Sequence, residues 1–368
     1  MKVLALYLPQ YHAIQENDEW WGKGYTEWSA VKGAEAYFKG HKQPRVPIDH
    51  WYYDLSDPDA RALKKQAELA RQYQVYGFVF YHYWFKAGKQ LLEKPMKILL
   101  AHKEIRIHYA VCWANESWTR TWYGLENKVL MRQEYGGEEE WTSHFNYLLP
   151  FFSDERYIKI DNKPVIHIYH SYEIEDLRQM IDCWQKLAKD NGFGGVYIIC
   201  GNTGGGVEKR QNIADAYYNF EPSYSLIYKT RITERIHYGL TVRIRELCNK
   251  LFKKKVIERQ IDGETFINRM VRDDIISGAK IYPCVFPQWD NTPRRKYKGT
   301  CFMKMTPQTF RDQIEQMMKK YPDADFLYVN AWNEWGEGAY LEPDTENGSA
   351  FLEELADAVG SKQDHMDW

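Results

Sequence analysis

Eight short apolar runs, separated by stretches with helical patterning, constrain the fold of this chain more than any other feature. Several runs are apolar on both faces, as are the strands of a parallel sheet that helices cover on both sides. Strands that alternate with helices predict βα units and a parallel sheet. The runs are Val3–Leu8, Gly77–Trp84, Ile105–Trp113, Pro164–His170, Gly195–Cys200, Ala214–Phe220, Ala279–Phe286 and Asp325–Trp332.

Helical patterns fill the intervals between these runs. Asp57 can cap the first predicted helix and Thr306 the last, because each precedes a proline at the first helical position. The predicted helices are Pro58–Tyr73, Gly137–Phe152, Ile174–Asn191, Gly263–Ser277 and Pro307–Tyr321.

Eight βα units over 368 residues predict an α/β fold, a (β/α)8 TIM barrel, with residues 1–368 as a single catalytic domain. A doubly wound open sheet is the alternative. That fold usually has a glycine-rich turn after its first strand, whereas Pro9 follows the first run here. The barrel is therefore the favoured prediction.

Two loops, after the first and sixth predicted strands, are much longer than usual, with insertions at residues 9–57 and 222–262. The first is rich in aromatic residues, and long ordered loops of this kind often carry function. Within the second, Lys229–Arg259 holds ten Lys or Arg and three Glu, with apolar residues at helical spacing at Leu240, Ile244, Leu247 and Leu251. This basic amphipathic helix either packs on the barrel as a solvated helix or contacts a membrane or lipid-linked glycan.

Composition excludes several classes of protein. The 49 Lys and Arg balance 51 Asp and Glu, so nucleic acid is not an expected partner. The N-terminal MKVLALYLPQYH predicts a buried strand and not a signal peptide, and no run of about 18 apolar residues predicts a transmembrane helix. Six scattered cysteines without a C-x-x-C pair are typical of reduced thiols. We therefore expect a cytoplasmic location.

Aromatic and polar residues gather at the carboxyl ends of the predicted strands and in the first long loop. Active sites of (β/α)8 barrels lie at those strand ends. Aromatic residues make up 16% of the chain; their faces stack on sugar rings while amides, imidazoles and carboxylates bind the hydroxyls. The candidate substrate-binding residues are Tyr7, Gln10, His12, Trp20, Trp21, Glu27, Trp28, His82, Tyr83, Trp84, Trp113, Trp118, Tyr169, Asn219, Trp289, Asp290, Trp332 and Trp335.

The motifs of other chemistries are missing from the sequence. There is no G-x-x-x-x-G-K-[ST] phosphate loop and no G-x-S-x-G nucleophile elbow. His82, His167, His170 and Asp290 could in principle bind a metal, but no H-x-H or H-E-x-x-H spacing supports it. We predict neither a metal nor a cofactor.

Paired carboxylates among tryptophans indicate glycosidic-bond chemistry, which requires an acid for the leaving oxygen and a second carboxylate. Glu334 can pair with Glu337, in N-E-W-G-E-G, or with Glu116, in W-A-N-E-S-W. On an extended strand Glu334 and Glu337 would point to opposite faces. The glycines at 336 and 338 indicate a turn that could bring both into one pocket.

Each of these glutamates also has a structural interpretation. Glu337 could cap a turn or pair with an arginine, and Glu116 could serve as a structural ligand of its loop, for Arg120 or Arg294. The neighbouring Asn115 and Asn333 are further candidates for catalysis or substrate binding.

The sequence resembles the WbsX-type family, named as glycosyltransferases of bacterial surface-polysaccharide loci and related to the family 99 glycoside hydrolases. The similar stretches follow one another over nearly the whole chain. They are YLPQYH (7–12), ENDEWWGKGYTEW (16–28), FKGHKQPRVP (38–47), YGFVFYHYWF (76–85), LLEKP (91–95), CWANESWTR (112–120), WDNTPRR (289–295) and NAWNEWGEGAYLEPD (330–344).

The resemblance implies a (β/α)8 barrel and a mechanism. The family 99 hydrolases carry a similar N-E-W-x-E-G, cut α-mannosidic linkages inside a chain with retention, and need no metal. By this resemblance, Glu334 would remove a proton from the substrate's 2-hydroxyl, whose oxygen attacks the anomeric carbon to form a 1,2-anhydro intermediate. Glu337 would protonate the leaving oxygen and then deprotonate the incoming water.

We therefore expect a carbohydrate-active enzyme that cleaves, or transfers at, an internal α-glycosidic bond of a bacterial surface polysaccharide. The first alternative is a sugar-nucleotide-dependent glycosyltransferase of lipopolysaccharide, capsule or O-antigen biosynthesis, although no nucleotide-binding fold is recognisable in the sequence. The second alternative is an inactive glycan-binding protein, against which the presence of both Glu334 and Glu337 argues. Sugar identity, linkage and oligomeric state stay open.

Overall fold

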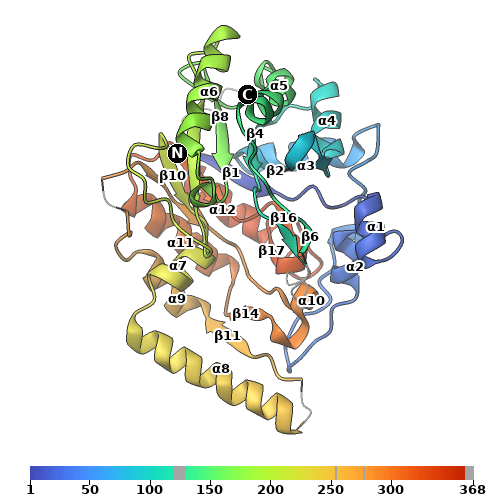
Figure 1. The fold of residues 1–368 in the computed structure, drawn as a ribbon. Helices are drawn as coiled ribbons and strands as arrows, with labels where there is room; N and C mark the ends of the chain where they lie inside the picture. The colour runs from blue at the N-terminus through green and yellow to red at the C-terminus, as the bar shows by residue number, and fades with distance from the viewer. Residues whose placement is uncertain (120–128, 253–254, 277, 361–368) are drawn as a thin grey trace.

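A nearly closed parallel barrel forms the centre of the protein (Figure 1). The structure, a computed structural model, describes residues 1–119, 129–252, 255–276 and 278–360. Each of the eight predicted runs contains a strand. The barrel strands are β1 (Lys2–Tyr7), β2 (Val75–Trp84), β4 (His108–Trp113), β8 (Lys163–Ile168), β9 (Tyr197–Asn202), β10 (Ala216–Asn219), β12 (Ile281–Tyr282), β13 (Cys284–Val285) and β15 (Phe326–Val329).

The strand order is β12-β10-β9-β8-β4-β2-β1-β15-β13, and every pair along this path is parallel. The two ends of the order, β12 and β13, are separated only by Pro283. One chain segment therefore pairs with β10 on one side and with β15 on the other. This segment nearly closes the sheet, and the predicted (β/α)8 barrel is confirmed.

Helices between the strands cover the barrel. The five predicted helices are found as α3 (Arg61–Gln72), α5 (Glu138–Phe152), α6 (Leu177–Asp190), α9 (Gly263–Met270) and α11 (Pro307–Lys320), alongside α4 (Lys94–Ala101) and the C-terminal α12 (Ala350–Gly360). The predicted end of α9 at Ser277 is wrong, because the helix ends at Met270 and the described residues that follow, up to Ile276, are not helical.

The two predicted helix caps have different outcomes. Thr306 caps α11 as predicted, because its side chain accepts a hydrogen bond from the Thr309 amide at 3.2 Å. The cap predicted at Asp57 is wrong. Helix α3 starts only after Ala60, which has a left-handed backbone, and the Asp57 carboxylate instead accepts hydrogen bonds from the Asp59 amide and the Arg61 side chain.

Polar and aromatic side chains meet inside the barrel. The His167 Nε2 lies 2.6 Å from the Tyr328 hydroxyl, and the Cys112 Sγ lies 3.7 Å from the Tyr218 hydroxyl. These residues belong to strands that are not neighbours in the sheet, so the contacts cross the interior. Alternate residues of each strand therefore fill the barrel, while the residues between them face the helices.

Long segments follow β1 and β10. The segment after β1 holds α1 (Gln15–Trp21), α2 (Glu27–Lys32) and the short helix η1 (Ile48–His50). The segment after β10 holds α7 (Ser223–Tyr228), α8 (Ile232–Phe252) and β11 (Arg259–Asp262), which pairs in parallel with β14 (Thr300–Met303). In the described part of the chain, the helices are too short or too polar to cross a bilayer.

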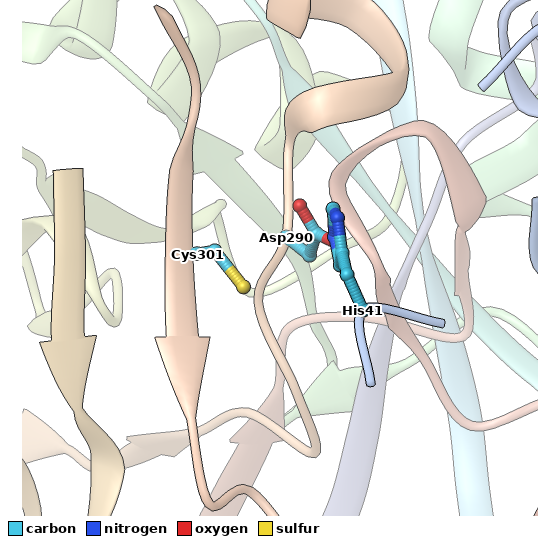
Figure 2. Close-up of side chains that lie close together, drawn as sticks. All are labelled: His41, Asp290 and Cys301. Carbon is cyan, nitrogen blue, oxygen red and sulfur yellow. The ribbon is translucent and has the colours of Figure 1, made fainter. Parts of the chain in front are cut away.

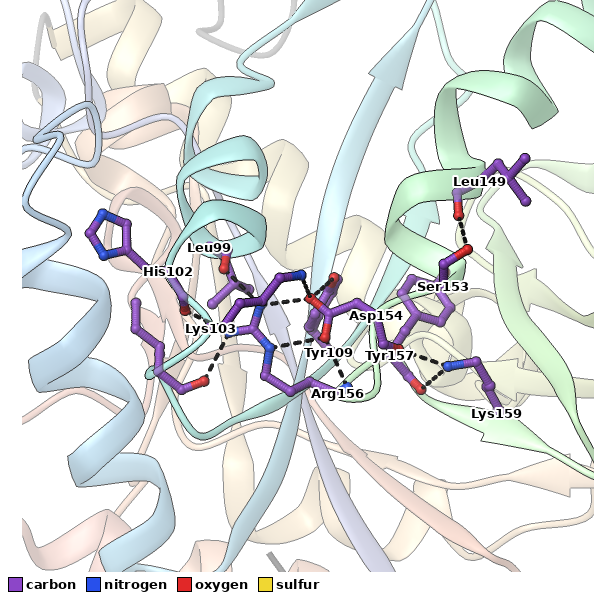
Figure 3. Close-up of polar contacts among 11 residues, drawn as sticks. Leu99, His102, Lys103, Tyr109, Leu149, Ser153, Asp154, Arg156, Tyr157 and Lys159 are labelled. Carbon is purple, nitrogen blue, oxygen red and sulfur yellow. Dashed lines mark hydrogen bonds and ion pairs between the residues drawn. The ribbon is translucent and has the colours of Figure 1, made fainter.

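A polar cluster closes the amino end of the barrel beside β4 (Figure 3). The Arg156 guanidinium donates to the carbonyl oxygens of Leu99, His102 and Ile105 at 2.8 to 2.9 Å. It also pairs with Asp154, whose pKa burial alone would raise but which hydrogen bonds from cationic side chains hold below its usual range. These contacts fix the turns that enter β4 and β8, so this end of the barrel serves structure.

Candidate active site

A cavity of about 430 Å³ opens at the other end of the barrel, where the strands end. Residues in the last part of β2 and after β1, β4, β8, β9, β10, β13 and β15 line it. Seven of the predicted site residues belong to this lining: Gln10, Tyr83, Glu116, Tyr169, Trp289, Glu334 and Glu337. The lining also includes residues that were not predicted as site residues, among them Tyr81, His170, Phe220, Arg294 and Arg295.

A tight hairpin after β15 presents Glu334 and Glu337. It consists of β16 (Asn333–Glu334), the short helix η6 (Trp335–Glu337) and β17 (Ala339–Tyr340), with Glu334 paired to Ala339. Gly338 ends the turn with φ of 62°, a left-handed conformation that favours glycine. This turn replaces the extended strand on which the two carboxylates would have diverged, and both reach the cavity.

One arginine, Arg294, contacts three carboxylates. It lies on α10 (Thr292–Arg295) and its guanidinium nitrogens lie 2.7 Å from Glu27, 2.7 Å from Glu334 and 2.9 Å from Glu337. Glu27 is fully buried on α2. A side chain at Gly336 would collide with the Glu27 carboxylate, so glycine at this position allows the three acids to converge.

When all acids of this cluster are ionised, three carboxylates contact the Arg294 guanidinium, and Arg295 is the other cation that acts on Glu337. Burial raises the pKa of Glu334 and that of Glu337, and although Arg294 opposes this shift, neighbouring carboxylates add to it. With the pKa of Glu334 raised to about 8 and the pKa of Glu337 raised as well, the two side chains can take up and release protons near neutral pH, as acid–base catalysis requires.

Glu116 lies on another part of the cavity wall. Burial raises its pKa to about 7, and its carboxylate lies 3.8 Å from the His170 Nδ1. Arg120, the alternative partner considered for Glu116, lies outside the described residues. Asn115, in contrast, joins two strand ends, because its side chain exchanges hydrogen bonds with the His170 backbone at 2.8 and 2.9 Å.

Three predicted site residues, His82, Trp84 and Trp113, face the helix layer. The His82 Nε2 lies 2.9 Å from the His144 Nε2 on α5, the Trp84 indole donates to Glu140 on the same helix, and the Trp113 indole donates to the Trp84 carbonyl. Successive side chains of a strand point to opposite faces. Since Tyr81 and Tyr83 of β2 line the cavity, the residues that alternate with them cannot.

A buried carboxylate, Glu342, binds a second group of predicted site residues. It accepts hydrogen bonds from the indoles of Trp332 and Trp335, at 3.2 and 2.6 Å, and from the Tyr53 hydroxyl at 2.9 Å. It also accepts from Gln66, to which the Tyr7 hydroxyl donates in turn. These contacts anchor the hairpin that carries Glu334, so Glu342, which was not among the predicted site residues, positions the site from behind.

Further predicted residues are absent from the cavity lining and contact other parts of the protein. Asn333 exchanges hydrogen bonds with the Leu8 backbone at 2.8 and 3.0 Å, and Asn219 donates to Asp274 at 3.0 Å. Trp20 packs on Trp118, which packs edge-on against Tyr83. The other three contact protein groups: His12 the Pro9 carbonyl, Trp21 the Tyr25 ring, and Trp28 the Tyr53 carbonyl.

Asp290 forms a compact cluster with His41 and Cys301 (Figure 2). The Tyr37 amide donates to the His41 Nδ1, so Nε2 carries the hydrogen that is donated to Asp290 at 2.7 Å. Asp290 also accepts from the Thr292 amide and hydroxyl. These hydrogen bonds engage His41 and Asp290, and those from Thr292 fix the start of α10.

Relatives of this chain are found by sequence. A family model described as Glycosyltransferase WbsX matches residues 3–355. The Uncharacterized protein WxcX of Xanthomonas campestris pv. campestris is 34% identical over 362 residues in each of two strains, which is 97% of this chain and 49% of the relative. The chain thus spans about half the length of the curated relatives that it matches.

Solved structures share the fold over almost the entire chain. The GH99 endo-α-mannosidase of Bacteroides thetaiotaomicron matches with a TM-score of 0.58 and 13% identity, over 98% of this chain and 96% of the enzyme. A glycoside hydrolase-like protein also matches with a TM-score of 0.58, over 97% and 93%. At such identity the similarity concerns the fold. The sequence match over residues 3–355 shows that this chain belongs to the WbsX glycosyltransferase family.

Proposed function

We propose that this protein is a carbohydrate-active enzyme that cleaves, or transfers at, an internal α-glycosidic bond of a bacterial surface polysaccharide. The observation that carries the proposal is the convergence of Glu334 and Glu337 on one guanidinium at the wall of an open cavity. The fold shared with a GH99 endo-α-mannosidase and membership of a family named for glycosyl transfer support it.

In the proposed mechanism the substrate supplies its own nucleophile. The Glu334 carboxylate removes the proton of the 2-hydroxyl, and that oxygen attacks the anomeric carbon as the glycosidic bond breaks. Glu337, protonated at this stage, donates its proton to the leaving oxygen. In the second step Glu337 deprotonates a water, or an acceptor hydroxyl, that opens the 1,2-anhydro ring, and Glu334 returns its proton to the 2-oxygen. Each step inverts the configuration at the anomeric carbon, so the two steps together retain it.

Arg294 keeps this proton exchange within a single cluster. Its guanidinium contacts Glu334 and Glu337 at the same time, so it stabilises whichever of them is ionised. During the first step the negative charge passes from Glu334 to Glu337 without any movement of the cation. Glu27, behind Arg294, holds the guanidinium in place.

Aromatic residues of the cavity give the substrate its binding surface. Tyr83, Tyr169 and Trp289 line the cavity with Gln10 nearby, which supplies ring faces for sugar C–H groups and an amide for hydroxyls. Trp20 and Trp118 pack in the layer behind Tyr83 and would steady its ring.

The test is hydrolysis of α-linked polysaccharides, α-mannans included, without any nucleotide donor. We expect shortened chains, and NMR of the first product formed should show a retained anomeric configuration. Glu334→Gln and Glu337→Gln should each lower kcat by roughly 10² to 10⁴-fold, whereas Glu138→Gln, an exposed change on α5, should have no effect. Full activity in both cavity variants would refute the assignment of the site.

The role of the 2-hydroxyl has its own test. A substrate that lacks this group in the sugar on the non-reducing side of the cleaved bond should bind and remain intact, whereas direct attack by a carboxylate would still cleave it. The family name favours a second candidate function, sugar-nucleotide-dependent transfer. That function would show as product formation that strictly requires a nucleotide donor. An inactive glycan-binding protein would bind the polysaccharide and convert it under neither condition.

A further inference from the structure

Helix α8 carries a row of large apolar side chains that point away from the protein. Figure 1 shows the helix along the outside of the molecule, with β11 and β14 between it and the barrel. The row members are each more than half exposed, from 53% at Leu247 to 77% at Ile232. Spacings of three or four residues place them on one face of the helix: Ile232, Ile236, Leu240, Ile244, Leu247 and Leu251.

The opposite face of α8 attaches the helix to the protein. Tyr238 packs against the edge of the core, and the Asn249 side chain donates to the Val256 carbonyl at 2.8 Å. Glu234 forms an ion pair with Arg272, beyond α9, at 2.7 Å. The helix is thus held by residues outside the apolar row, and the row itself is free for another surface.

Cations accompany the apolar row. Arg243 and Lys250 are exposed at its margin, and neither forms an ion pair within the described part of the chain. The acids of the helix are engaged, since Glu234 pairs with Arg272 and Glu246 lies 3.7 Å from Arg259. The surface around the row therefore has a net positive charge.

We infer that the exposed face of α8 binds the surface of a bilayer that contains anionic lipids. A helix of 21 residues is about 32 Å long and can lie in the plane of the interface, with its apolar row among the acyl chains and its cations beside the headgroup phosphates. A second copy of this face would bring the same cations together, so charge complementarity favours the anionic lipid.

Short connections link this helix to the cavity. The Glu258 amide donates to the Tyr297 carbonyl at 3.0 Å, and the Arg259 side chain donates to the Lys298 carbonyl at 2.7 Å. Tyr297 and Lys298 follow closely after Arg294, which contacts the catalytic candidates. These contacts join the chain after α8 to the segment that follows Arg294, and if the proposed function holds, the substrate is a glycan attached to that membrane.

Sedimentation with lipid vesicles tests the inference on the full chain. We expect binding to vesicles of phosphatidylcholine mixed with phosphatidylglycerol at low salt, and little binding to phosphatidylcholine alone. Changing Leu240, Ile244 and Leu247 together to Ser should weaken binding about a hundredfold. Arg243→Gln with Lys250→Gln should weaken it about thirtyfold and reduce its dependence on salt.

Matched control variants show whether the loss of vesicle binding is specific to α8 or follows from any substitution of exposed residues. Val129→Ser removes an exposed apolar side chain elsewhere, and Lys186→Gln with Lys189→Gln removes two exposed cations of α6, so both should bind like the parent. Circular dichroism should show each variant folded. The inference is overturned if the parent does not bind the anionic vesicles, or if the triple serine variant binds them equally well. It is also overturned if the parent forms a dimer that the serines abolish. Each of these outcomes is independent of hydrolytic activity.

Discussion

Replacement of Arg294 by Met is the sharpest test of the charge arrangement in the cavity. Methionine keeps much of the side-chain volume but removes a cation that lies within 2.9 Å of three carboxylates. The variant retains the buried acids and loses their counter-charge. Removing one partner from a buried ion pair costs about 3–5 kcal/mol in unfolding free energy while the remaining charge stays ionised.

The loss of unfolding free energy in Arg294→Met should grow as pH rises. Burial raises the pKa of Glu334 and that of Glu337 above their unfolded values, and loss of Arg294 raises both further. Above the unfolded pKa of about 4.3 the folded state then holds more protons than the unfolded state, so stability falls as pH rises. We expect a loss of about 3–5 kcal/mol at pH 8 and about 1–2 kcal/mol at pH 5, where protonation relieves the unpaired charges.

Urea denaturation of parent and variant at the two pH values measures this difference. Arg61→Met is the control, because Arg61 forms an exposed ion pair with Asp57 on the surface and its loss should change stability little at either pH. An equal loss for Arg294→Met at pH 5 and pH 8 would show that the guanidinium does not serve to hold ionised carboxylates, and the proposed proton sharing would fail with it.

Three further outcomes are expected. Gly336→Ala should displace the Glu27 carboxylate and lower both kcat and the melting temperature; an unchanged kcat would contradict the close approach. Glu342→Gln places an amide donor among four hydrogen-bond donors and should lower the unfolding free energy, measured by urea denaturation, by about 2–3 kcal/mol; an unchanged urea midpoint would contradict this. Trp289→Ala should raise KM, whereas Trp113→Phe should lower stability with KM unchanged; the reverse pattern would show that Trp113 binds the substrate and Trp289 is structural.

Much of the architecture could be predicted, because strand and helix patterns are properties of neighbouring residues. All eight apolar runs contain barrel strands, and α11 begins at the predicted cap. The start of α3 was missed because Asp57 uses its carboxylate on a surface turn. The pattern of glycines also indicated the turn that carries Glu334 and Glu337.

The assignment of strand-end residues was less reliable, since proximity to the end of a strand does not say which face a side chain occupies. Tyr83 lines the cavity, while its neighbours His82 and Trp84 pack against α5. Alternate positions of a strand face opposite sides of the sheet. A shift of the strand by one residue would therefore exchange the residues that face the cavity with those that face the helices. The carboxylate of Glu342 was overlooked although it lies in a stretch already singled out, because two of its four donors, Tyr53 and Gln66, are 289 and 276 positions away.

The sequence by itself determined the barrel, the order of its elements and the presence of an acidic pair among aromatic residues, because each follows from periodicity or from residues close together in the chain. Tertiary structure alone decided that Glu27, Arg294 and Glu334 meet. These residues are separated by 267 and 40 positions, and only closure of the barrel brings them into contact. The same closure decides which carboxylates share a cation, and therefore where a proton is held.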